Sequence, residues 1–250
     1  MTGSFLTAWH FLTAIPLSRV NHEPKPSELA RSMGWFPAVG LILGALLVVS
    51  DRVLSSVLAP GVVEGLLVAL LVIATGGLHQ DGLADTLDGL AGGRTPAERL
   101  AIMRDARIGA IGATGLILAL GLRYAALVAL PQGDRAPILL CMPAVGRWTM
   151  VLGALSAPYA RPEGGLAQPF LAHLLARDVR LATFSLAVVL VVAFGLMAAV
   201  LTLVVTAVVA VGISKLCYRL CEGITGDTLG ATNELAEINF LLIGPTLLHV

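Results

Sequence analysis

Residues 76–109 have the sequence GGLHQDGLADTLDGLAGGRTPAERLAIMRDARIG and lie between two hydrophobic runs that look membrane-spanning. This stretch holds nine of the 32 charged residues in a chain that has few charges overall, and four of the nine are aspartates and four are arginines. Gathering both signs of charge here favours a site for metal and phosphate. The alternative is a solvated loop held by salt bridges.

The spacing of three aspartates supports a metal site. Asp81, Asp85 and Asp88 are separated by four and three residues, so on an α-helix they share one face within an arc of about 60°. Three carboxylates this close repel one another. A divalent cation removes that repulsion, and Mg²⁺ prefers oxygen ligands, often together with substrate phosphates. We therefore predict a helix that carries this acidic face and ends at Gly92 and Gly93.

A second helix is predicted to follow, with Thr95 as its N-cap and Pro96 at its first position. It is expected to carry Arg104 and Arg107, three residues apart on one face, with Asp105 beside them. Carboxylates that hold a metal and guanidinium groups that bind phosphate oxygens are the components that phosphoryl transfer needs.

Composition indicates a membrane protein. The chain is 57% hydrophobic and 13% charged, whereas soluble domains are about 25% charged. The predicted fold class is all-α, a polytopic integral membrane helix bundle that forms a single transmembrane domain over residues 1–250. A net charge of zero implies no bulk attraction to nucleic acid. Cys141, Cys217 and Cys221 form no metal or redox motif and are expected to be small apolar residues.

Hydropathy predicts about seven spans after an N-terminal interfacial helix. Residues 5–18 make only about 20 Å of helix, which is too short for a hydrocarbon core of about 30 Å, so they should lie at the interface or against the bundle. The run 181–219 is too long for one span and should turn between Gly195 and Val200, and Pro245 interrupts the last span. The predicted spans are 35–54, 61–79, 108–130, 136–156, 181–198, 200–219 and 236–250.

Basic residues orient this bundle with its N-terminus in the cytoplasm. The inner side then carries twelve Lys and Arg and the outer side only Arg52 and Arg135, which is a clear positive-inside bias. This orientation gathers segments 80–107, 157–180 and 220–235 on the cytoplasmic face of the plasma (inner) membrane. The inner basic residues are Arg19, Lys25, Arg31, Arg94, Arg99, Arg104, Arg107, Arg161, Arg177, Arg180, Lys215 and Arg219.

The third of these segments begins a second polar cluster. Asp227 and Glu234 are seven residues apart and share a helix face, so they could complete the metal site or hold the second substrate. The alternative is that Thr225 or Asp227 caps the helix and that first-turn acids suit its dipole. Glu234 and Glu237 favour function, because carboxylates are costly near the start of a hydrophobic span. Asn233, beside Glu234, is assigned to substrate binding with it.

Other polar residues in or near the spans have open roles. Arg123 could snorkel to the interface, whereas Arg147 lies mid-span and needs an acidic partner, for which Glu64 is one candidate. His79 lies off the aspartate face and is expected to be a hydrogen-bonding neighbour at the membrane boundary. Segment 157–180 fits either a substrate lid or a simple connector.

Several blocks of this chain resemble the cobalamin synthase family (adenosylcobinamide-GDP ribazoletransferases). The blocks GGLHQDGLADTLDGLAGG and RLAIMRDARIGAIG are quite specific, as is the pattern within GDTLGATNELAE at 226–237. ARPEGGL at 160–166 also matches, and FLTAIPL near the start is weak alone. The matches run in order across nearly the whole chain.

The resemblance implies a membrane enzyme that joins GDP-activated adenosylcobinamide to α-ribazole or its 5′-phosphate, releasing GMP. It also implies Mg²⁺ as the cofactor and the lipid bilayer as a partner, while a homo-oligomer or pathway partners stay open. The hypothesis assigns the metal to Asp81, Asp85, Asp88 and Asp105, the substrates to Arg104, Arg107, Asn233 and Glu234, and proton transfer to Asp81 or Asp227.

Two other classes fit part of the pattern. CDP-alcohol phosphatidyltransferases also place aspartates at helical spacing at a membrane face, and Asp85-x2-Asp88-Gly89 matches the start of their motif. Gly92 and Gly93 replace its Ala-Arg, however, and its later paired aspartates are absent. An ion-coupled transporter should hold its acids near the bilayer midplane, whereas here they are expected at one face.

Overall fold

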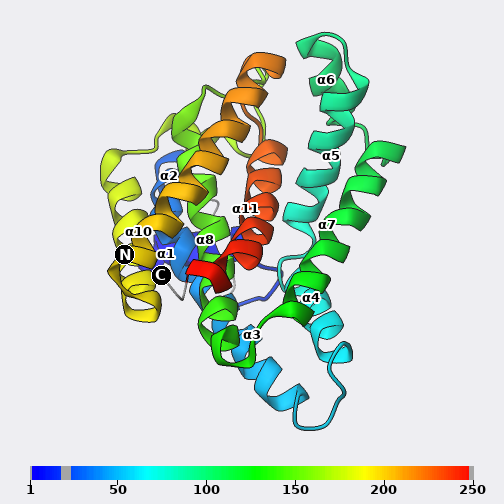
Figure 1. The fold of residues 1–250 in the computed structure, drawn as a ribbon. Coiled ribbons are helices and arrows are strands. Elements are labelled where there is room, and N and C mark those ends of the chain that lie inside the picture. Colours follow the sequence, from blue (N-terminus) through cyan, green and yellow to red (C-terminus); the bar gives the residue numbers. More distant parts are fainter. Residues whose placement is uncertain (1, 18–23, 248–250) are drawn as a thin grey trace.

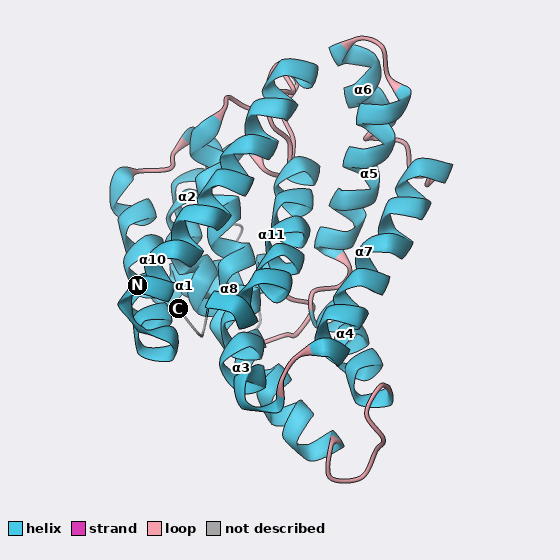
Figure 2. Cartoon of the chain, in the orientation of Figure 1, coloured by secondary structure: helices cyan, strands magenta, loops and turns pink. Residues whose placement is uncertain are grey.

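A computed structural model describes residues 2–17 and 24–247, and helices are the main secondary structure in that part of the chain (Figures 1 and 2). The predicted all-α class is confirmed. Arg19 and the last three residues of the span predicted at 236–250 lie outside the described residues. The helices are α1 (Thr2–Leu12), α2 (Pro26–Ser32), the 3₁₀ turn η1 (Met33–Trp35), α3 (Phe36–Leu54), α4 (Val62–Ala74), α5 (Leu78–Gly92), α6 (Pro96–Ile102), α7 (Ala110–Ala129), α8 (Gln132–Ser156), α9 (Gln168–Ala172), α10 (Ala176–Cys221) and α11 (Gly226–Leu247).

Several helices suit a membrane, but the predicted count of seven spans is not confirmed. In the described chain, four helical stretches are long and apolar enough to cross a bilayer. The count is five if α4 and α5, which are bent by 87° relative to each other, form one broken span. The four stretches are 26–54, 110–129, 132–156 and 176–221.

Glycines set two sharp turns in this bundle. Gly76 and Gly77 have φ of 63° and 71°, a left-handed conformation that glycine adopts without steric cost, so α4 ends at Ala74 and the span expected to reach residue 79 is shorter. Gly195 has φ 81° and ψ 171° inside α10. The chain turns back on itself there (Figure 1), which confirms the turn predicted between Gly195 and Val200.

The two helices predicted in 76–109 are present as α5 and α6. Thr95 caps α6 by accepting a hydrogen bond from the backbone N–H of Glu98 at 3.2 Å. The prediction that this helix also carries Arg104 and Arg107 is wrong, because α6 ends at Ile102. Beyond Ile102 the chain is non-helical up to Gly109, and the Asp105 side chain accepts the backbone N–H of Arg107 at 3.0 Å, a local hydrogen bond that competes with helical hydrogen bonding.

Helix α8 lies at the centre of the bundle and is buried along most of its length against α3, α10 and α11. A Cβ atom at Gly40 or Gly44 of α3 would overlap the backbone of α8, so these small residues let the two helices approach closely. Cys141, Cys217 and Cys221 are free and buried, as expected for small apolar residues. Helix α1 packs against the bundle through Ala8 and Leu12.

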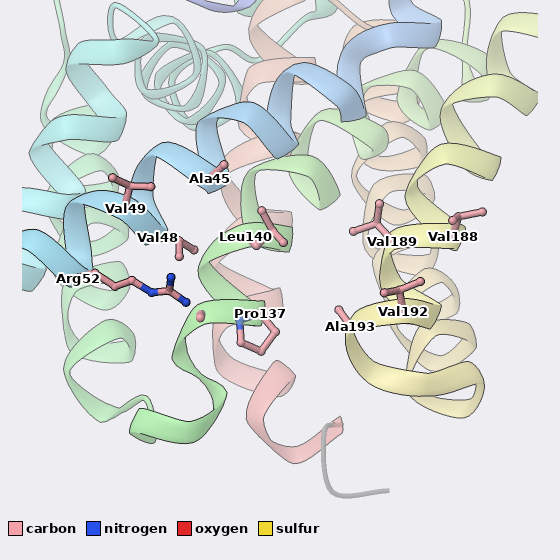
Figure 3. Close-up of a pocket in the computed structure, with 11 residues that line it drawn as sticks. Ala45, Val48, Val49, Arg52, Pro137, Leu140, Val188, Val189, Val192 and Ala193 are labelled. Carbon is pink, nitrogen blue, oxygen red and sulfur yellow. The ribbon is translucent and has the colours of Figure 1, made fainter.

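An apolar groove of about 530 Å³ runs between α3, the start of α8 and α10 (Figure 3). Its walls include Val48, Val49, Val188 and Val192, with Arg52 at one edge. Such a surface suits lipid chains and contains none of the predicted site residues. The carboxylates therefore lie elsewhere, where α5 meets α11.

Candidate active site

Two glycines bring α5 against the first turns of α11. A Cβ atom at Gly82 would lie 2.8 Å from the carbonyl oxygen of Asp227, and one at Gly230 would lie 3.4 Å from the Cα of Gly82. The bare backbones can therefore approach closely. This contact places Asp81 and Asp85 beside Asp227, from a segment about 140 residues later in the chain.

The carboxylates at this contact are poorly compensated. Asp85 is repelled by the charges of Asp81, Asp227 and Asp88, and the charge of Arg161 opposes this repulsion. Arg161 is itself paired with Asp227, with 2.7 Å between Nη2 and Oδ2. Among the described residues, no three His, Cys, Asp or Glu side chains are arranged closely enough to hold one metal ion as they stand.

Asp227 is free of the capping role that the sequence left open. Thr225 caps α11 instead, because its Oγ1 accepts the backbone N–H of Thr228 at 3.2 Å. Thr225 also donates its hydroxyl to Asp227 Oδ2 at 3.2 Å. Asp227 is thus held by Thr225 and Arg161 facing α5. The sequence left segment 157–180, which contains Arg161, as either a substrate lid or a simple connector and did not predict this pairing.

Asp88 lies on the acidic face of α5 and also accepts two backbone hydrogen bonds at the start of α7. Its two carboxylate oxygens accept the backbone N–H groups of Gly109 and Gly112, each at 2.7 Å. A carboxylate at the positive end of a helix is favourable, so Asp88 caps α7. Its assignment as a metal ligand stays a prediction.

Asp105, Arg104 and Arg107 lie on the loop after α6. Arg107 donates from Nε and Nη2 to the two carboxylate oxygens of Asp105 at 3.0 and 2.7 Å. These hydrogen bonds lower the pKa of Asp105 to about 2. The structure thus pairs Asp105 with Arg107 and not with the aspartates of α5, and the assignments of both residues stay predictions.

The three segments expected to gather at one side of the bundle do contact one another. Arg104 pairs with Glu163 and donates to the carbonyl oxygen of Gly164 at 3.3 Å. Arg99 donates to the carbonyl oxygen of Leu220 at 2.7 Å. With the Arg161–Asp227 pair, these contacts join segments 80–107, 157–180 and 220–235 around the carboxylates.

Glu234 and Glu237 take part in a buried ion cluster below the aspartates. Nη2 of Arg123 lies 2.8 Å from an oxygen of Glu234 and 2.8 Å from an oxygen of Glu237, and Arg147 also pairs with Glu237. All four side chains are at most 2% exposed. Arg123 therefore does not snorkel.

Glu64 is not the partner of Arg147. It pairs with Arg135 at 2.6 Å, and Arg135 also pairs with Asp51 at 2.8 Å. The sequence could not decide between these partners, because each acid is far in sequence from either arginine.

Asn233 and Glu234, predicted to bind substrate, are both buried. Asn233 donates to Glu237 at 3.2 Å, and Gln80 donates to Glu234 at 3.0 Å. The ion cluster with these amides thus connects α5, α7, α8 and α11 and fixes the helices that hold the aspartates. A direct role of Asn233 and Glu234 in binding substrate stays a prediction.

Comparison with known proteins covers nearly the whole chain. The family model described as "Cobalamin-5-phosphate synthase" matches residues 4–244. A relative from Syntrophobacter fumaroxidans, named adenosylcobinamide-GDP ribazoletransferase, is 42% identical over 245 residues, which are 96% of this chain and 97% of the relative.

Two further relatives have the same name. The protein from Geotalea daltonii is 40% identical over 97% of this chain and 96% of its own length, and that from Ectopseudomonas mendocina is 38% identical over 94% and 95%. No solved structure matches the chain significantly. Neither the CDP-alcohol nor the transporter alternative is favoured by these matches. On the extent of the family match, the chain belongs to the cobalamin-5-phosphate synthase family.

Proposed function

We propose that this protein is an adenosylcobinamide-GDP ribazoletransferase of the plasma (inner) membrane with its active site facing the cytoplasm. It joins GDP-activated adenosylcobinamide to α-ribazole or its 5′-phosphate and releases GMP. The observation that carries the proposal is the under-compensated carboxylate face where Asp81 and Asp85 meet Asp227, in a chain whose full-length relatives have that name.

The carboxylate face fits a hard divalent cation by its chemistry. Its donors are oxygens, and their mutual repulsion favours a bound cation. Asp81 and Asp85 would hold Mg²⁺, with Asp88 and Asp105 as the further predicted ligands. When bound, the ion supplies charge stabilisation to the phosphates of the donor.

Residues of this chain supply the rest of the chemistry. A ribose hydroxyl of the acceptor attacks the phosphorus that bears cobinamide, the bond from that phosphorus to the oxygen of GMP breaks, and the hydroxyl proton passes to a carboxylate. Asp81 suits that last role better than Asp227, because Arg161 and Thr225 already engage Asp227. No hydrogen bond or ion pair engages the Asp81 side chain within the described residues.

Arg104 and Arg107 would neutralise the charge that develops on departing GMP. Arg107 is highly exposed, with 88% of its side chain accessible, and Arg104 is also open to solvent. Both can therefore reach a substrate that approaches from outside the bundle. Arg104 is also held by Glu163, which lies on the same segment as the Arg161 that pairs with Asp227.

The decisive experiment is release of GMP by the full chain in liposomes. Adenosylcobinamide-GDP and α-ribazole are supplied separately and together, with Mg²⁺ and then with EDTA. The expected result is GMP that appears only with both substrates and Mg²⁺ and matches a cobalamin product. GMP release without α-ribazole, or no release at all, would contradict the proposal.

A further inference from the structure

A cavity of about 160 Å³ lies beside the carboxylates, between α5, the start of α11 and the segment that follows α8. His79, Asp81, Arg161 and Asp227 provide polar groups in its wall. Tyr159 adds a phenol, and the other side chains of the wall are apolar, among them Phe11, Leu78 and Leu166. The space fits a pentose with part of an attached aromatic base and is far too small for a corrin macrocycle.

Three residues of this wall, His79, Tyr159 and Arg161, have buried polar atoms without a partner among the described residues, and His79 has two such atoms. The His79 side chain is 1% exposed, and neither ring nitrogen has a hydrogen-bond partner in the part of the chain that the structure describes. His79 was expected to be a hydrogen-bonding neighbour at the membrane boundary, but its ring makes no hydrogen bond within the described residues. A buried polar group without a partner costs about 1–3 kcal/mol, which favours a ligand that supplies the missing hydrogen bonds.

A second unpartnered group points to the same ligand. Nε of Arg161 is buried and has no acceptor among the described residues, while Nη2 of the same side chain pairs with Asp227. The cavity wall thus includes His79 of α5 and Arg161, two residues with buried nitrogens that have no partner among the described residues.

The charge of the wall selects the class of ligand. Arg161 is offset by Asp227, while the Asp81 side chain has no cationic partner among the described residues. The guanidinium of this wall is therefore already engaged, so it is not available to bind the pyrophosphate of the donor. An uncharged molecule with an aromatic base and sugar hydroxyls matches both the apolar surface and the polar groups.

We propose that this cavity is the acceptor site, which binds the neutral nucleoside and hydrogen-bonds a non-reacting ribose hydroxyl through His79. The inference rests on the proposed function and adds the place of one substrate. His79 orients the ribose, and Asp81 in the same wall takes the proton as the new oxygen–phosphorus bond forms and GMP leaves. The donor then occupies the open side of the carboxylates, towards Arg104.

The test separates the two substrates by their KM values. The full chain is reconstituted in liposomes as wild type, His79→Phe and His79→Gln, and KM is measured for α-ribazole and for adenosylcobinamide-GDP. His79→Phe should raise KM for α-ribazole about tenfold, the loss of one hydrogen bond of about 1.4 kcal/mol, and leave KM for the donor unchanged. His79→Gln, which keeps a donor and an acceptor, should recover part of the loss.

His173→Phe is the matched control, because His173 is exposed near the end of α9 and should leave both KM values unchanged. If folded His79→Phe keeps the wild-type KM for α-ribazole, or raises both KM values equally, the acceptor site is elsewhere. A wild-type protein that releases no GMP instead overturns the proposed function, and this inference with it.

A second measurement covers the case in which His79→Phe does not fold. Wild-type protein is assayed with α-ribazole analogues that each lack one non-reacting ribose hydroxyl. One analogue should show the tenfold rise in acceptor KM. Equal KM values for all analogues would refute the hydrogen bond from His79.

Discussion

Two acidic clusters lie about two helical turns apart on α11, and they differ in how their charges are balanced. In the inner cluster, Glu234 and Glu237 face Arg123 and Arg147, so two negative charges meet two positive ones. At the start of the helix, Asp227 joins an aspartate face that is opposed mainly by Arg161.

The difference separates a structural ion cluster from a ligand site. Buried charges that are paired and hydrogen-bonded within the protein hold helices in place and have little capacity for a further cation. Carboxylates that repel one another without compensation favour a bound cation or proton. Both clusters contain carboxylates at helical spacing, so the partners decide which cluster does chemistry.

The largest effect is expected from the uncompensated cluster. Asp85→Asn removes a charge that the metal site would use, so GMP release should fall at least about 10³-fold. Stability should be unchanged or slightly higher, because repulsion among the aspartates is relieved. Turnover and thermal unfolding are measured on the same preparation, with Glu222→Gln at an exposed position as the control. Near-normal turnover in Asp85→Asn would refute the assignment of Asp85 as a metal ligand.

The balanced cluster should respond in the opposite way. Glu237→Gln leaves Arg123 and Arg147 short of one buried partner, so the free energy of unfolding should fall by about 3–5 kcal/mol. Any loss of turnover should follow the loss of folded protein. Denaturant unfolding in detergent measures the change.

A double variant sharpens this second prediction. Combining Glu237→Gln with Arg147→Gln removes both charges, and the combined loss should be smaller than the sum of the single losses. Strict additivity would mean that the two side chains do not stabilise each other.

The contact between α5 and α11 that brings the aspartates together can be loosened by adding one methyl group. Gly82→Ala places a Cβ 2.8 Å from the carbonyl oxygen of Asp227, so α5 and α11 must separate. Turnover should fall about 10- to 100-fold, since misplacement by about 1 Å can cost 10²-fold. Gly121→Ala on α7, where no atom lies within 4 Å of the added Cβ, is the control. Equal turnover in the two variants would show that the close contact is not needed.

The smallest effect on stability is expected at the exposed Asp105–Arg107 pair. Because the pKa of Asp105 is lowered to about 2, any stability from this pair is present above about pH 4. It is lost only as the pH falls towards 2. Asp105→Asn should therefore shift the unfolding temperature by no more than about 2 °C, by a constant amount between pH 5 and 8. A shift that varies across that window would show that Asp105 has another partner.

Features set by local rules were predictable from the sequence. The spacing of the aspartates predicted α5, and Thr95 predicted the cap of α6. The long apolar run with Gly195 predicted the turn in α10. The basic residues also indicated that three distant segments lie on one side. The end of α4 at Ala74 was missed, because hydropathy does not register a bend at Gly76 and Gly77.

The sequence by itself determined an all-helical, apolar chain with an acidic helix face and a set of arginines near it, because helical periodicity and hydropathy are properties of neighbouring residues. Only the tertiary structure decided which acid meets which base. Glu237 pairs with Arg147 and Glu64 pairs with Arg135. Asp81 has no cationic partner among the described residues. The reason is physical: a carboxylate is compensated by whatever lies within a few ångströms of it, and helix packing sets those distances.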